Sequence, residues 1–126
     1  MKAICGSLAL AAIAALSSPA SADGPDGVWV TQDKKAHVRF AACGSGVFCG
    51  YLDWMDAKGK LAPGSQMIFN VTKTSANAYS GILVHPQTGK KYKGTMRMSG
   101  SNSMKLKGCI ISLPFLCESQ TWTKKN

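Results

Sequence analysis

Four cysteines are the residues whose type and spacing most directly permit chemistry in this chain. Cys43 and Cys49 enclose a glycine-containing segment, and Cys109 and Cys117 enclose a segment with one proline. Neither pair has the close C-x₂₋₄-C spacing of a structural zinc site. Facing residues of a β-hairpin lie within disulfide range, so the sequence predicts the local bridges Cys43–Cys49 and Cys109–Cys117. A tetrahedral four-cysteine zinc site is the alternative.

The N-terminal segment has the pattern of a cleavable export signal. Lys2 is followed by an uncharged apolar run over residues 3–16, and Ala20-Ser21-Ala22 has the small-x-small pattern of a cleavage site. The apolar run is too short for a membrane-spanning helix, which needs about 20 residues. We therefore expect cleavage after Ala22, loss of Cys5 with residues 1–22, and a single domain over residues 23–126. The mature chain, without a transmembrane segment, would be periplasmic or secreted, where disulfides form readily.

Catalytic candidates are few. The chain has two histidines: His37 shares a predicted strand face with Arg39, and His85 lies in a predicted turn. Asp53 and Asp56 lie near a predicted strand end, where carboxylates commonly bind backbone or solvent. The sequence contains no Ser-His-Asp arrangement, no H-E-x-x-H motif and no paired-carboxylate motif. We therefore expect a protein that is not an enzyme and that has no cofactor and no metal.

Basic residues alternate with apolar ones in two neighbouring segments near the C-terminus. The chain has a formal net charge of +9, which favours anionic partners in general. The candidate anion-binding residues are Lys91, Lys93, Arg97, Lys105 and Lys107. They form either a solvated outer face or a site for phosphate-bearing envelope components. The absence of interleaved aromatic residues and the predicted export argue against a nucleic-acid partner.

The opposite, apolar face supplies the candidates for binding a small molecule. The interior candidates are Trp54, Tyr92, Met96, Met98, Met104 and Trp122. Methionine fills irregular gaps and also suits adaptable binding surfaces. These residues therefore form either an ordinary packed core or a pocket for a small apolar ligand.

Apolar and polar residues alternate with a period of two, which places them on opposite faces of a strand. This pattern predicts an all-β fold. The expected strands cover residues 27–31, 35–41, 47–54, 66–73, 77–84, 90–98, 102–108 and 118–124. An even number of short antiparallel strands with tight connections predicts a closed up-and-down barrel, which leaves no exposed sheet edge. Eight strands enclose a space that side chains fill or that holds one small ligand. The apolar segment 110–116 is expected to cover one barrel end as a plug, with a gate or a membrane-contacting tip as the alternative.

Several short motifs in order resemble one bacterial family. They are Gly27-Val28-Trp29, Cys49-Gly50, Pro86-x-x-Gly89-Lys90-x-Tyr92, Gly108-Cys109 and Leu116-Cys117-x-Ser119-Gln120-Thr121-Trp122. Together they resemble the exported bacterial proteins grouped as domain of unknown function 2147. The resemblance implies a small lipocalin-like, or calycin-type, barrel and carries no established activity. The chain departs from the family at His85, commonly aspartate, and at Lys124, commonly arginine. The resemblance implies that Lys124 lies over the Trp29 ring in a cation–π contact.

Two functional hypotheses follow. The first is a periplasmic binding module that holds a small apolar or amphipathic ligand inside the barrel. The alternative is an envelope interaction protein that uses its basic outer face to contact an anionic surface or a protein partner. The interior discriminates between them, because an open cavity favours the first and a filled barrel favours the second.

Overall fold

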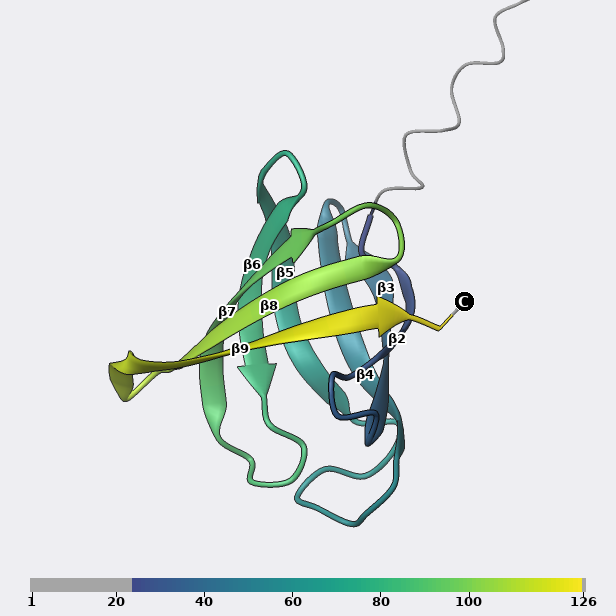
Figure 1. Cartoon of the computed structure of the whole chain (residues 1–126). Helices are drawn as coiled ribbons and strands as arrows, with labels where there is room; N and C mark the ends of the chain where they lie inside the picture. Colours follow the sequence, from purple (N-terminus) through teal and green to yellow (C-terminus); the bar gives the residue numbers. More distant parts are fainter. Residues whose placement is uncertain (1–23, 126) are drawn as a thin grey trace, which may run out of the picture.

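Eight antiparallel strands form a closed barrel in the computed structural model, which describes residues 24–125 (Figure 1). The strands are β2 (Gly27–Val30), β3 (Ala36–Gly44), β4 (Val47–Met55), β5 (Gln66–Ser75), β6 (Ala78–Val84), β7 (Lys91–Met98), β8 (Ser103–Ile110) and β9 (Leu113–Lys124). Each strand pairs with the next, and β9 pairs with β2. The predicted all-β barrel of eight strands is confirmed. The predicted export signal, residues 1–22, lies outside the described residues.

Strands β7 and β8 show why alternation predicts this fold. Met96, Met98, Met104 and Leu106 are buried, whereas the residues between them are exposed. The register pairs Met96 with Leu106 and Arg97 with Lys105. The apolar face of the hairpin therefore lines the barrel interior, and the basic face lies outside, as the sequence predicts.

Trp29 lies at the seam where the sheet closes on itself. Its side chain is fully buried, and Nε1 donates a hydrogen bond to the backbone oxygen of Pro25 over 2.8 Å. Trp29 pairs with Lys124, whose Nζ lies 5.5 Å from the centroid of the indole ring. The cation–π contact implied by the family resemblance is present. The seam joins β2 and β9 through two residue pairs, so the buried tryptophan is a major part of barrel closure.

One end of the barrel is filled by large side chains. Phe40 packs edge-on against Trp122 with ring centroids 6.4 Å apart, and Phe48 packs edge-on against Tyr79 at 6.1 Å. Over the whole barrel, the largest fully buried residues are Trp29, Phe40, Leu52, Ile68, Met96, Met104, Val38, Val71 and Pro25. This packed region leaves space only toward the other end of the barrel.

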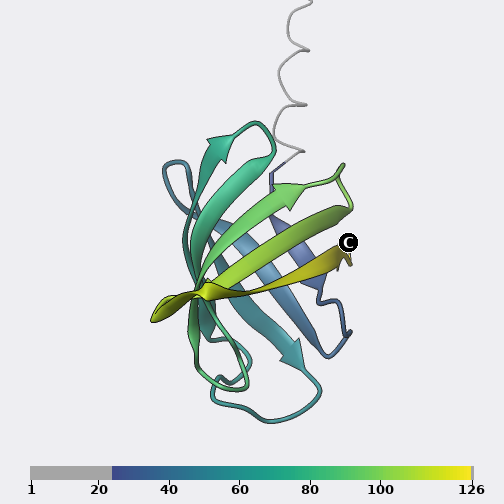
Figure 2. The same ribbon diagram turned by 60° about the vertical axis from the view of Figure 1, so that its left-hand side comes forward.

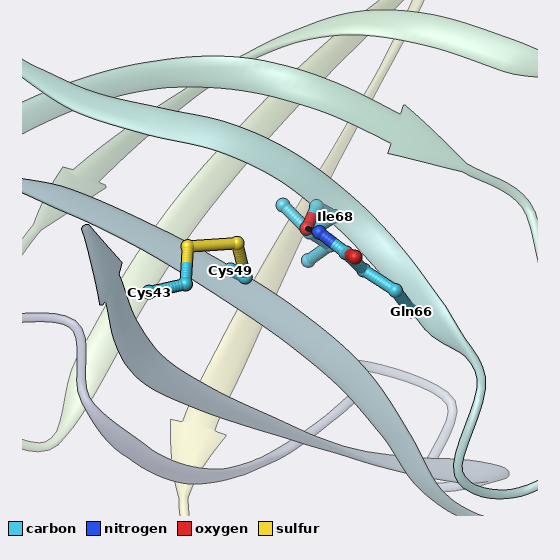
Figure 3. The surroundings of a disulfide bond; sticks show 4 residues. All are labelled: Cys43, Cys49, Gln66 and Ile68. Atoms are coloured by element: carbon cyan, nitrogen blue, oxygen red, sulfur yellow. Dashed lines mark hydrogen bonds between the residues drawn. A yellow bond between two sulfur atoms is a disulfide. The ribbon is translucent and has the colours of Figure 1, made fainter.

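Both predicted disulfides are present. Cys43 and Cys49 are joined at the end of the β3–β4 hairpin, and Figure 3 shows this bridge beside Gln66 and Ile68 of β5. Cys109 and Cys117 face each other directly in the β8–β9 register and have Cα atoms 4.0 Å apart. Each bridge therefore closes a short local loop, as hairpin geometry predicts.

The prediction that segment 110–116 plugs a barrel end is wrong. Strand β8 continues to Ile110 and β9 begins at Leu113, so the segment is the end of a hairpin (Figures 1 and 2). Its large side chains are exposed, and Phe115 is 73% exposed. The plug does not form because the β8–β9 ladder continues past the disulfide, which carries the segment away from the barrel.

Removing the second disulfide is expected to destabilise the fold. In the chain-entropy model, the Cys109→Ser/Cys117→Ser variant loses about 2–3 kcal/mol of unfolding free energy, because the unfolded chain gains freedom. Urea denaturation of the oxidised wild type and the variant measures the difference. Non-reducing peptide mapping is the control, and a peptide joining Cys43 to Cys109 would contradict the local pairing.

The contact between the Lys124 ammonium group and the Trp29 ring leads to a second prediction. Lys124→Ala should lower the free energy of unfolding by about 0.5–1 kcal/mol, because the indole loses its cation. Lys124→Arg should keep or raise stability, since guanidinium also stacks on the ring. Lys125→Ala, a change at an exposed neighbour, is the matched control and should have no measurable effect. Equal losses at both positions in thermal or urea denaturation would contradict the assignment.

Candidate functional site

A cavity of about 230 Å³ opens at the end of the barrel opposite the large core residues. We call it the cup. Its lining residues are Thr31, Asp33, Lys35, Ala36, Met55, Met67, Leu83, Val84, His85, Pro86, Gln87, Tyr92, Leu106, Gly108, Glu118, Gln120 and Trp122. The β2–β3 and β6–β7 connections contribute to its mouth. The barrel interior is therefore partly packed with side chains and partly open.

Two of the six predicted interior residues line the cup, and four do not. Tyr92 and Trp122 are among the lining residues. Met96, Met98 and Met104 face inward but lie in the packed core. The structure therefore assigns the methionines to packing, and the aromatic pair remains available for contact with a ligand.

The prediction that Trp54 faces the interior is wrong. The register pairs Val38 with Leu52 but His37 with Trp54, so Asp53 is an extra residue on β4. This bulge shifts the alternation by one position and turns Trp54 outward, where it is 42% exposed. Its ring packs on His37 with centroids 4.8 Å apart. Both residues therefore lie on the outer face, away from the cup.

A row of glycines crosses the wall of the barrel beside the cup. Gly81 pairs with Gly94, which pairs with Gly108 in the next strand. A Cβ atom on Gly94 would lie 2.6 Å from Cδ1 of Leu83, and one on Gly108 would lie 3.3 Å from Cβ of Tyr92. The missing side chains let Leu83 and Tyr92 lie against the backbone of the wall. The row thus helps to keep the centre of the cup open.

Polar side chains of β9 also line the cup, and the sequence analysis did not select them. Glu118 and Gln120 alternate with the inward Trp122 and therefore share its face. The indole Nε1 of Trp122 donates a hydrogen bond to Oε1 of Gln120 over 2.8 Å. The alternation of these three residues is visible in the sequence, but a polar residue on the inner face is a weak signal without the register.

The β2–β3 turn forms a rigid part of the rim. Oδ1 of Asp33 accepts hydrogen bonds from the Thr31 hydroxyl at 2.9 Å and from the Lys35 backbone N–H at 3.0 Å. The backbone bond from Lys35 is the main cause that lowers the pKa of Asp33 below its ordinary value. Oε1 of Gln32 accepts a hydrogen bond from the backbone N–H of Thr121 at 2.8 Å, which ties this turn to β9. The carboxylate is therefore engaged in holding the rim.

His85 has a structural part at the mouth of the cup. Its Nδ1 accepts backbone N–H groups from Gln87 at 3.2 Å and from Thr88 at 3.4 Å. An aspartate carboxylate could accept the same two bonds in a turn before proline. The histidine therefore holds this turn at the position where the family resemblance leads one to expect aspartate.

Residues 24–125 contain no helix long and apolar enough to cross a membrane. Within the same range, no three or more histidine, cysteine or carboxylate side chains cluster closely enough to hold a metal ion. Arg39 and Asp53, 4.0 Å apart on the outer face, form the one ion pair found among the described residues. The five basic residues predicted as an anion site therefore have no acidic partner within that part of the chain.

The comparisons with known proteins agree with this architecture. Residues 27–124 match the model of a family described as uncharacterized proteins conserved in bacteria, DUF2147. The chain belongs to this family. No curated protein sequence gives a significant match to the DUF2147 chain.

One solved structure has a fold similar to that of this DUF2147 protein. Protein HP1028 from the human pathogen Helicobacter pylori, described as belonging to the lipocalin family, matches with a TM-score of 0.65. The two sequences are 16% identical, and the match covers 80% of this chain and 82% of that chain. The shared feature is the lipocalin-like barrel.

The engaged carboxylate of the rim gives a prediction for pH. Because the pKa of Asp33 is lowered on folding, its ionised form stabilises the fold above about pH 4, and this contribution is lost as the pH falls through the folded-state pKa. The wild type should therefore be more stable than Asp33→Ala at neutral pH. The gap should narrow as the pH falls below about 4 and through the folded-state pKa, because the carboxyl group then becomes protonated in both states. Urea denaturation across this range measures the gap, and a constant gap would contradict the assignment.

Proposed function

We propose that this protein is an exported binding protein that holds a small apolar or amphipathic molecule in the cup. The observation that carries the proposal is the cavity of about 230 Å³ beside a tightly packed core. A cavity that served no binding purpose would cost stability, because its lining atoms lack contacts that packing would supply. The lipocalin-like barrel and the two disulfides support a binding role outside the cytoplasm.

The size of the cup restricts the ligand. An apolar cavity of about 150 Å³ holds a benzene molecule, and pockets for drug-sized ligands are about 300–1,000 Å³. The cup therefore accepts a single ring or a short alkyl segment, and the rest of a longer molecule would project through the mouth. A long acyl chain does not fit inside.

The lining of the cup indicates a ligand with one apolar and one polar part. Tyr92, Leu106 and Trp122 offer an apolar surface. Gln120 uses its Oε1 for the Trp122 indole, which leaves the Nε2 protons for an oxygen of the ligand. Glu118 adds an acceptor on the same inner face. The molecule that suits this arrangement has an apolar ring or short chain and a hydroxyl or similar polar end.

Binding is favoured over catalysis because Asp33 and His85, two of the titratable groups that line the cup, already have structural partners. The carboxylate of Asp33 and the Nδ1 atom of His85 both accept hydrogen bonds from backbone groups of their own turns. His37 lies on the outer face against Trp54. A general base needs its proton acceptor available to the substrate, and these groups are already engaged or lie elsewhere.

Calorimetric titration with phenol, 4-ethylphenol, 1-hexanol and dodecanoate tests the proposal. The ring-containing and six-carbon probes should bind saturably. Gln120→Phe should weaken binding at least about tenfold, or about 1.4 kcal/mol, because the new ring occupies the cup. Ser119→Phe is the matched control, because Ser119 is exposed and faces the other side of β9. The affinity of this variant for the probes should be unchanged.

Absence of saturable binding for every probe would contradict the proposal, as would equal loss in both variants. Native mass spectrometry of protein purified from its own cell envelope identifies the natural ligand by its added mass. Circular dichroism of both variants checks that the barrel is intact.

A further inference from the structure

The exposed apolar surface of the barrel is concentrated in one place. Four of the five exposed large apolar residues in the described chain lie in residues 110–116, which we call the apolar tip. Ile111 is 50% exposed, Leu113 44%, Phe115 73% and Leu116 48%. Contiguous exposed apolar side chains of this kind mark an interaction site.

The covalent framework enforces this exposure. Cys109 pairs with Cys117, but Ile110 pairs with Leu113, so residues 114–116 bulge out of β9. The disulfide fixes one end of the bulge, and the Cys117 Sγ atom lies 3.6 Å from the backbone oxygen of Pro114. Figures 1 and 2 both show the ribbon end projecting to the side of the barrel. The apolar tip is therefore presented by the fold and does not cover the core.

Basic residues lie beside the apolar tip on the outer face. A surface depression is lined by Lys93 and Lys107 together with Ile110, Ile111 and Pro114. Lys91 is exposed at the start of β7, and its backbone oxygen accepts a hydrogen bond from the Ile111 N–H at 3.2 Å. Glu118 is the acidic residue nearest in sequence, and it faces the cup on the other side of the ribbon. The apolar tip thus has a positive border on its outer face.

We propose that the apolar tip docks on the surface of an anionic lipid bilayer. Phe115 and its apolar neighbours enter the boundary between headgroups and acyl chains, and the three lysines contact lipid phosphates. Interfacial segments bind through this combination of apolar burial and attraction to anionic lipids. A second copy of the chain is a poorer partner, because an association between two tips would bring two positive borders together. This docking site is separate from the cup and does not depend on ligand binding there.

Vesicle flotation with protein produced from the full-length chain tests the docking. Wild type should float with vesicles made from equal parts of phosphatidylglycerol and phosphatidylcholine, and much less with phosphatidylcholine alone. Binding should decrease as salt is added, because exposed charges are screened. All variants share the same N-terminus, which mass spectrometry defines, so differences between them report the substituted residues.

The apolar contribution is tested by exchanging one exposed aromatic residue at a time. Phe115→Ser should lower the partition coefficient about tenfold, because a phenyl ring no longer enters the interface. Trp54→Ser is the matched control: it also removes an exposed aromatic, but from the outer face of β4, and binding should stay within about twofold. Equal effects of the two changes would overturn the proposal.

The charge contribution is tested with two variants of equal net charge. Lys93→Glu/Lys107→Glu reverses the border of the apolar tip and should weaken binding at least about tenfold. Arg97→Glu/Lys105→Glu reverses the far end of the same basic face and should weaken binding by less than about threefold, because these charges lie farther from the surface. All four residues are exposed, and circular dichroism verifies the fold.

Three further results would overturn lipid docking. One is the absence of vesicle binding by the wild type. Another is equal loss in both charge variants, which would indicate attraction by net charge alone. The third is a concentration-dependent dimer in sedimentation that Phe115→Ser abolishes, which would assign the apolar tip to a protein interface.

Discussion

The interior of an eight-stranded barrel has room for side chains and little else, so the size of each inward residue decides where space remains. Trp29, Phe40 and Met104 are large and fully buried. Toward one end, the inner face carries Ala36 and Gly108 and leaves the cup. The function proposed here depends on this gradient of side-chain size along the barrel axis.

The glycine row adds a constraint from the backbone. Gly81, Gly94 and Gly108 lie side by side in β6, β7 and β8, so these three strands carry no side chain at this level. Leu83 and Tyr92 occupy the space beside that wall. An alanine at Gly94 would place its methyl group against Leu83, which lines the cup and would have to shift. The space inside the cup therefore depends on three glycines, which have no side chain.

The alternation of apolar and polar residues was the sequence feature that predicted most of the fold. Its period of two placed the methionines of β7 and β8 inside and the five cations outside, and the cysteine spacing predicted both bridges. It failed at Trp54, because the extra residue Asp53 reverses the faces beyond it and a bulge has no clear signal in a single sequence. Segment 110–116 was expected to form a plug, with an exposed tip only as the alternative, since the pairing of Ile110 with Leu113 depends on register.

The candidate site was harder to predict than the fold. Tyr92 and Trp122 were selected because they are large and apolar on inward positions, and they line the cup. Glu118 and Gln120 lie on the same face as Trp122, but polarity normally indicates the outer face of a strand. The glycine row links residues far apart in the sequence, and only the register of three strands brings them together.

The seam between β2 and β9 has a mechanical consequence. Trp29 pairs with Lys124 and Val30 with Thr123, and the backbone N–H of Lys125 donates to the oxygen of Val28 at 2.7 Å. Residues 24 and 125 therefore leave the barrel at the same end of this short ladder. A pulling force applied between them would peel the ladder open one bond at a time and would not shear the longer hairpins. The barrel is softest along this direction, and its first opened form is a curved sheet with β2 and β9 at its edges.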